Sequence, residues 1–80
     1  MEKKSLYDLK IMYPKIGGTY YHYKGGYYEV MFLSKHSETD EVLVNYKSKS
    51  FGSYHSRPLE SFNEQVELEE GTFRRFILVK

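Results

Sequence analysis

The chain has 80 residues, a formal net charge of +1 and no cysteine. A chain of this length forms one domain that buries only about 60–65% of its unfolded surface, so we expect marginal stability. The missing cysteines exclude disulfide bonds and thiolate metal sites, and a nearly neutral charge is not typical of strongly cationic nucleic-acid binders.

The first predicted element is a short helix over residues 5–12. Ser5 begins it with an acidic residue three positions later, and leucines recur at helical spacing until Pro14. A helix this short is not stable alone, so we expect it to cover an open edge or end of a sheet. We therefore divide the chain into an N-terminal helical extension (residues 1–16) and a β domain (residues 17–80).

From Thr19 onward the pattern changes to period two, in two aromatic and β-branched runs joined by Gly25-Gly26. Gly-Gly is a favoured two-residue hairpin loop, because turns of types I′ and II′ need positive φ. Such a loop pairs Lys24 with Tyr27 and fixes the register of the whole hairpin.

This register sorts the hairpin side chains onto two faces. One face is expected in the core and carries Tyr21, Tyr23, Tyr28, Val30 and Phe32. The other mixes rings with charged groups and carries Tyr20, His22, Lys24, Tyr27, Glu29 and Met31. The second face is a poor core and a good recognition surface, although antiparallel sheets also leave an ordinary polar face in water.

The rest of the chain predicts short strands separated by loops. Residues 41–47 alternate, residues 54–57 are extended up to Pro58, which starts one helical turn, and residues 65–69 and 72–80 form a second hairpin. Five or six short strands predict a mainly β fold, a small, partly open SH3-like barrel. We expect its core to comprise Tyr21, Tyr23, Tyr28, Val30, Phe32, Val42, Val44, Leu59, Phe62, Phe76 and Leu78.

Charge is distributed unevenly along the second half of the chain. Residues 47–57 contain Lys47, Lys49 and Arg57 and no acidic residue, whereas residues 60–70 contain five glutamates and no basic residue. Both segments are compatible with ordinary solvated surface, and the basic one also with a binding surface for anions.

Three short motifs resemble one known pattern. They are "HYKG" at residues 22–25, "HSET" at residues 36–39 and "RPL" at residues 57–59. On these motifs the chain resembles the small bacterial and phage family known as domain of unknown function 1653, over about residues 17–77. The resemblance implies no activity, since none is generally assigned to that family. It implies that the family pattern includes the polar positions Tyr20, His22, Lys24, His36, Glu38, Tyr46 and Arg57.

Enzymatic and metal chemistry find little support in the sequence. A zinc site needs three or four ligands, and His22, His36, Glu38 and His55 do not have ligand spacing. Ser37 is next to a histidine only in sequence, whereas nucleophilic catalysis needs a serine with a positioned base. We therefore expect no enzyme, no metal and no cofactor.

Two kinds of binding protein remain, and the first is our main expectation. It recognises a small nucleotide-like molecule: Tyr and His rings stack on a flat ring, Lys24 and Arg57 pair with phosphate, and Glu38 accepts from a hydroxyl or an amine. The alternative is a small-barrel module that binds single-stranded nucleic acid or a protein.

These two possibilities predict different surfaces. A small ligand requires the polar positions to converge in a concave pocket, whereas a polymer or protein requires an open groove or a flat face. A homodimer that shares the pocket would favour the small ligand and compensate for the thin core. We expect a cytoplasmic protein without a membrane partner, because we find no export leader and no apolar run near 20 residues.

Overall fold

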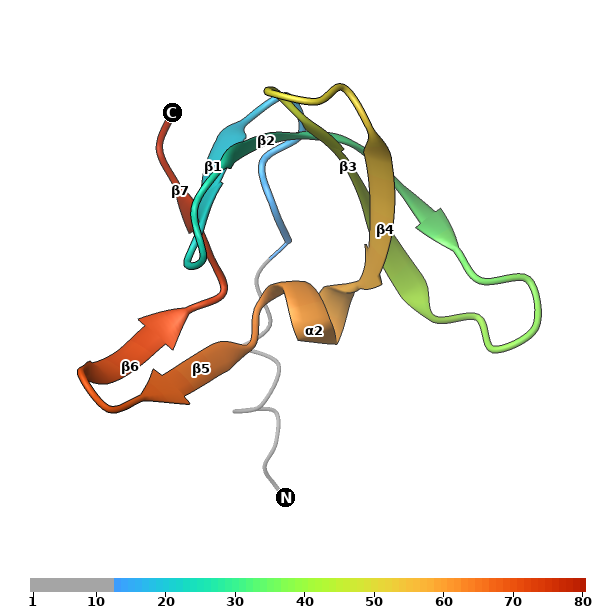
Figure 1. Ribbon diagram of the computed structural model, residues 1–80. Helices are drawn as coiled ribbons and strands as arrows, with labels where there is room; N and C mark the ends of the chain where they lie inside the picture. Colours follow the sequence, from blue (N-terminus) through green and yellow to red (C-terminus); the bar gives the residue numbers. More distant parts are fainter. Residues whose placement is uncertain (1–12) are drawn as a thin grey trace, which may run out of the picture.

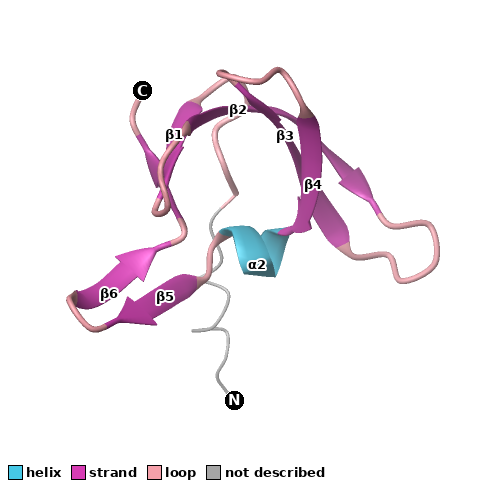
Figure 2. Cartoon of the chain, viewed as in Figure 1, coloured by secondary structure: helices cyan, strands magenta, loops and turns pink. Residues whose placement is uncertain are grey.

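The computed structural model describes residues 13–80, and the helix predicted over residues 5–12 lies outside them. The described part is mainly β, which confirms the predicted class, with one short helix (Figures 1 and 2). The elements are β1 (Thr19–His22), β2 (Tyr27–Lys35), β3 (Val42–Ser48), β4 (Tyr54–Pro58), α2 (Leu59–Phe62), β5 (Gln65–Leu68), β6 (Gly71–Arg74) and β7 (Phe76–Leu78).

The strands form a five-stranded antiparallel sheet in the order β4-β3-β2-β1-β7 and a separate β5–β6 hairpin. Figure 1 shows the larger sheet curved into an arch, with α2 beneath its concave side and the β5–β6 hairpin projecting from one end. Within the described residues the sheets are not closed into a barrel, so the SH3-like barrel is not confirmed.

The connection between β1 and β2 differs from the prediction. Tyr21 pairs with Tyr27, and the N–H of His22 donates to the carbonyl of Gly26. The N–H of Gly25 donates back to the carbonyl of His22, so residues 23–25 form a three-residue loop. This is the hairpin in which a glycine with positive φ follows a tight turn, and Gly25 has φ +108°.

The prediction of a two-residue loop is therefore wrong, and so are the two faces derived from it. The observed pairing of Tyr20 with Tyr28 differs from the expected pairing of Tyr20 with Met31 by three positions. When the pairing of two strands shifts by an odd number of positions, the side chains of one strand share a face with the opposite alternate set of side chains on the other strand. Tyr20 and His22 consequently lie on the inner face, and Tyr21 and Tyr27 on the outer face.

A β-bulge interrupts β2. Val30 pairs with Tyr46 and Phe32 with Asn45, which leaves Met31 between them without a partner on β3. A bulge bends its strand and changes the alternation of side chains. Val30 is accordingly buried while Phe32, two positions later, is 55% exposed, and the sheet curves over α2.

The core lies between the concave side of the sheet and α2. Phe62 of α2 stacks on Phe76 with ring centroids 4.3 Å apart, and the Tyr20 ring meets Phe62 edge-on at 5.3 Å. Val30 and Val44 are fully buried beneath these rings. Pro58 ends β4 directly before α2, so the predicted single helical turn after Pro58 is confirmed.

Most of the predicted core is confirmed: Val30, Val44, Leu59, Phe62 and Phe76 are buried, and Tyr28 and Val42 pack against them. Three predicted members are wrong, because Tyr21, Phe32 and Leu78 are exposed, and Tyr23 lies half-buried in the β1–β2 loop. The shifted register and the bulge account for Tyr21 and Phe32. Leu78 lies on the edge strand β7, beside the cavity described below.

No helix within residues 13–80 is long and apolar enough to cross a membrane.

Candidate functional site

Five strands bring a group of aromatic and basic side chains together on the inner side of the arch. His22 on β1 pairs with Phe76 on β7, and Tyr46 on β3 pairs with His55 on β4. Arg57 follows His55 by two residues on β4, so both side chains point to the same face. We call this group the concave site: His22, Tyr28, Tyr46, His55, Arg57, Arg75 and Phe76.

The floor of the concave site is a set of contacting rings. His55 stacks on Tyr46 with centroids 5.4 Å apart, and His22 meets Phe76 edge-on at 4.9 Å. The Tyr28 ring is central, with centroids 5.4 Å from Tyr46, 6.0 Å from His55 and 6.1 Å from His22. Tyr46 and Phe76 are buried, whereas Tyr28 is half-buried and His55 is exposed. Tyr28 and His55 are therefore the rings that offer surface to a planar group.

The guanidinium of Arg57 is held in a fixed orientation at this floor. Its Nε donates to the Tyr46 hydroxyl at 3.3 Å, and Nη1 donates to the Ser61 hydroxyl at 3.0 Å. Its central carbon lies 6.0 Å from the centre of the Phe76 ring. Among the described residues no acceptor is bonded to Nη2. A pre-oriented guanidinium with free donors binds carboxylate or phosphate at little entropic cost.

The imidazole of His22 is half-buried. Its Nδ1 accepts from the backbone N–H of Lys24 at 3.1 Å, which leaves the ring proton on Nε2. Burial lowers the pKa of His22, and the positive charges of Arg57, Arg75 and Lys24 lower it further. Three cations thus act on this ring.

Arg75 is the second guanidinium of the concave site and is only partly neutralised. Its Nη2 forms an ion pair with Glu64 at 2.8 Å, with the Arg75 side chain 20% exposed. The Nε of Arg75 is buried and has no hydrogen-bond acceptor among the described residues. An unsatisfied buried donor costs about 1–3 kcal/mol, and an acceptor from a ligand would remove that cost after a small movement of the side chain.

The structure brings four of the seven predicted site residues together and separates three. His22, Tyr46 and Arg57 belong to the concave site, and Lys24 lies in the adjoining β1–β2 loop. Tyr20 is instead buried in the core, where its hydroxyl accepts from the backbone N–H of Lys15 at 2.9 Å.

His36 and Glu38 lie in the turn between β2 and β3, where the Glu38 N–H donates to Nδ1 of His36 at 3.1 Å. This turn follows Lys35, at the opposite end of β2 from the β1–β2 loop. Eight residue steps of strand separate the two ends, roughly 26 Å if the strand were straight. Figure 1 shows this hairpin projecting away from the rest of the arch. His36 and Glu38 therefore do not join the concave site.

Our reading of the sequence did not predict four members of the concave site as site residues: Tyr28, His55, Arg75 and Phe76. The alternation of β4 contained the signal for His55, because a residue two positions before Arg57 shares its face. The correct hairpin register would have placed Tyr28 on this face, whereas no pattern in the neighbouring sequence indicates Arg75. Within residues 13–80, no three His, Asp or Glu side chains are grouped so that they could hold a metal ion.

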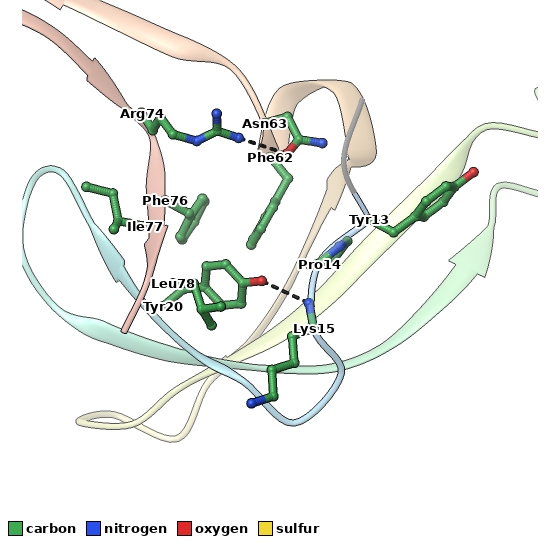
Figure 3. Close-up of a pocket in the computed structure, with 10 residues that line it drawn as sticks. All are labelled: Tyr13, Pro14, Lys15, Tyr20, Phe62, Asn63, Arg74, Phe76, Ile77 and Leu78. Carbon is green, nitrogen blue, oxygen red and sulfur yellow. Dashed lines mark hydrogen bonds between the residues drawn. The ribbon is translucent and has the colours of Figure 1, made fainter. Parts of the chain in front are cut away.

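A separate cavity of about 280 Å³ is lined in part by Phe62 and Phe76 (Figure 3). Two of its polar contacts are internal: the Tyr20 hydroxyl with the backbone of Lys15, and the Arg74 guanidinium with Oδ1 of Asn63 at 3.3 Å. The cavity presents mostly apolar surface. Its lining residues are Tyr13, Pro14, Lys15, Tyr20, Phe62, Asn63, Arg74, Phe76, Ile77 and Leu78.

Comparison with known proteins places the chain in a family. The family model described as "Protein of unknown function (DUF1653)" matches residues 18–78. The chain belongs to this family. The DUF1653 region includes every strand and α2, and the resemblance expected from the three motifs is confirmed.

A solved structure agrees with this assignment. The crystal structure of a DUF1653 protein from Bordetella bronchiseptica is 36% identical, with a TM-score of 0.71 over 79% of this chain and 85% of that chain. No curated protein matches the chain. The fold is therefore shared within DUF1653, and function has to be argued from the site.

Proposed function

We propose that this DUF1653 domain is a non-catalytic binding protein for a small anionic ligand with a flat ring, of nucleotide-like chemistry. The ligand binds at the concave site. One observation carries the proposal: a half-buried imidazole lies among three cations on a floor of aromatic rings. Rings and guanidinium groups at one site match a ligand that combines a planar group with phosphate.

Each side chain has a distinct part in this proposal. Arg57 donates to the phosphate through Nη2, and His22 donates through Nε2. Tyr28 and His55 contact the planar group, because theirs are the rings with exposed surface. Lys24, in the β1–β2 loop beside His22, adds positive charge. His36 and Glu38 have no part in it.

The proposal also covers the fold, the compartment and the oligomeric state of the protein. The curved sheet with α2 beneath it acts as an SH3-like platform, although its strands are not hydrogen-bonded into a barrel. We place the protein in the cytoplasm, in keeping with a cysteine-free sequence. A homodimer would add stability to so small a domain, but the concave site is formed within one chain.

The first test is binding of defined nucleotides. Native mass spectrometry of the purified protein shows whether an anionic small molecule accompanies it, and calorimetric titrations compare nucleoside monophosphates, cyclic nucleotides, nucleosides and inorganic phosphate. We expect phosphorylated nucleosides to bind more tightly than nucleosides or phosphate alone, since each alone uses only half of the site. Arg57→Lys should weaken binding about tenfold or more, because the charge remains but the planar fork is lost.

Lys35→Gln is the matched control for charge. Lys35 lies at the far end of β2, with only a 3.9 Å contact to Asp40, so its removal should leave binding unchanged. Thermal unfolding of Arg57→Lys separates a binding defect from a folding defect. Equal affinities of the Arg57 and Lys35 variants for the tightest nucleotide, or no binding by any phosphorylated compound, would contradict the proposal.

A further inference from the structure

The convex side of the sheet carries exposed rings and lysines that the concave site does not use. Phe51 is 88% exposed and Tyr54 is 66% exposed. Tyr27 is also exposed, and its ring lies 5.0 Å from that of Tyr21. We call the surface that follows these residues the convex strip: Tyr21, Tyr27, Lys47, Lys49, Phe51, Tyr54 and Lys80.

Strand pairing and one backbone hydrogen bond place five of these residues in two rows across the sheet. Tyr21 pairs with Tyr27, and the N–H of Lys49 donates to the carbonyl of Tyr27 at 2.9 Å. In the neighbouring row Glu29 pairs with Lys47, and Lys47 pairs with Tyr54. Each row thus brings at least one ring beside a lysine, and adjacent strands are about 4.8 Å apart.

Two shallow depressions make the strip continuous. One, of about 450 Å³, is lined by Tyr27, Lys49 and Lys80 among others. The next, of about 480 Å³, is lined by Lys47, Lys49 and Phe51 among others. Lys49 and Ser50 line both depressions, so a single extended molecule can lie across them.

The charge of the strip is positive. Lys47, Lys49 and Lys80 line the two depressions, and Glu29 is the one acidic residue there. The Nζ of Lys47 lies 5.5 Å from the centre of the Tyr54 ring. This ring and its cation form a unit that can contact a base and a neighbouring phosphate together.

We propose that the convex strip binds single-stranded nucleic acid. Unpaired bases stack on Phe51, Tyr54 and Tyr27, while the three lysines contact successive phosphates. Stacking on exposed rings beside a basic track is how sequence-tolerant single-strand binding works. This binding is independent of the concave site, which lies on the opposite side of the sheet.

The chemistry of the strip favours nucleic acid over an acidic protein. The lysines alone would attract either, but the exposed rings of Phe51, Tyr54 and Tyr27 offer surface on which bases can stack. With three phosphate contacts, log Kd should change with log salt with a slope of magnitude about 2. Binding is therefore expected to be weak and to be lost at moderate salt.

The test measures fluorescence anisotropy of a labelled oligothymidylate of about 12 nucleotides with the full chain. We expect binding at about 50 mM salt that weakens at about 200 mM, and weaker binding of a duplex of equal length, because paired bases cannot stack on the rings. Phe51→Ala and Tyr54→Ala should each weaken binding about fivefold or more. Lys49→Gln should reduce the magnitude of the salt slope by about 0.7.

Two variants serve as controls on the same sheet. Phe32→Ala removes an exposed ring from the outer face beyond the bulge, and Lys35→Gln removes an exposed lysine; both should bind as the parent chain does. Arg57→Lys should also leave oligonucleotide binding unchanged, so failure here and failure of the nucleotide proposal are distinguishable. The inference is overturned if the duplex binds equally well, if Phe51→Ala and Phe32→Ala behave alike, or if polyglutamate binds equally tightly.

Discussion

His22 is a histidine whose surroundings keep it uncharged. Its Nδ1 accepts a backbone hydrogen bond, and burial together with Arg57, Arg75 and Lys24 lowers its pKa below the ordinary value of 6.5. Protonation would place a fourth positive charge among three others and break the bond to Lys24. The neutral ring is thus part of the native structure, and the pH at which it is protonated affects folding.

This gives a sign for the pH dependence of stability. Because the folded pKa of His22 is lower than the unfolded one, the unfolded chain binds more protons below about pH 6.5. The free energy of unfolding should therefore be largest above pH 6.5 and should fall as the pH drops toward the folded pKa. Urea unfolding measured between about pH 5 and pH 8 tests this.

His22→Asn isolates the contribution of this residue. The Asn Oδ1 keeps an acceptor for the Lys24 N–H but does not titrate, and His36 and His55 remain in both proteins. The variant should lose less stability than the parent on acidification. A parallel pH dependence of the two proteins would show that His22 has no part in it.

At the residue level, the sequence predicts which kinds of side chain form the concave site better than it predicts which individual residues do so. Arg57 and His22 are grouped because charged and imidazole side chains are poor core residues, and the structure brings both to the concave site. Tyr20 and Tyr46 are buried, because a tyrosine can pack its ring and pair its hydroxyl, as with Lys15 and Arg57. Composition alone does not separate such tyrosines from those that contact a ligand.

At the level of elements, the β1–β2 hairpin decides which tyrosines are inside. Two-residue and three-residue loops both favour glycine at a position with positive φ, so Gly25-Gly26 predicts a hairpin without fixing its length. The observed loop leaves Gly25 at φ +108° and Gly26 at φ +100°. Deciding between these loops requires knowledge of which strand face is buried, and that depends on packing with α2 and β7.

Substitution of Gly25 tests this loop. A side chain at positive φ is strained, so Gly25→Ala should lower the free energy of unfolding by about 1–2 kcal/mol. The strain is conformational rather than steric, because a Cβ at Gly25 would approach Tyr21 Oη only to 3.9 Å. Gly25→Asn should cost less, since Asn tolerates positive φ better. Equal stability of all three proteins in urea titrations would contradict the observed conformation.

At the level of the whole molecule, one aromatic stack joins the sheet to its short helix. Phe62 is the buried ring of a four-residue helix, and it contacts Phe76, Tyr20 and Tyr46. No disulfide supports this core, and the chain contains no cysteine. The stability of the domain therefore depends heavily on a few rings.

Phe62→Ala should cost about 3–5 kcal/mol, a large part of the roughly 4–12 kcal/mol expected for a domain of this size. Urea unfolding monitored by circular dichroism measures the loss, and Phe62→Leu provides a milder variant if the alanine protein does not fold. Phe51→Ala is the matched control, because the exposed Phe51 ring should contribute within about 0.5 kcal/mol. Similar losses for Phe62 and Phe51 would show that the stack is not central.

The mainly β class and most of the core are predicted by period-two alternation, which Val42, Val44 and Tyr46 follow without interruption. The arch itself is not predictable in this way. Its shape depends on the bulge at Met31 and on the contact between Phe62 and Phe76, which are residues far apart in the sequence. A barrel is the simplest closure for short strands, and here the concave side is covered by α2 instead.

Because Met31 has no partner on β3, the curvature of the sheet can change without a change in the pairing of β2 with β3. Deleting another residue of β2 would move the side chains of part of the strand to the opposite face of the sheet. Deleting Met31 would instead keep every residue pair between β2 and β3. What it would lose is curvature, and a flatter sheet would lift away from the helix beneath it. The fit between sheet and helix thus rests on an amino acid that joins no strand pair.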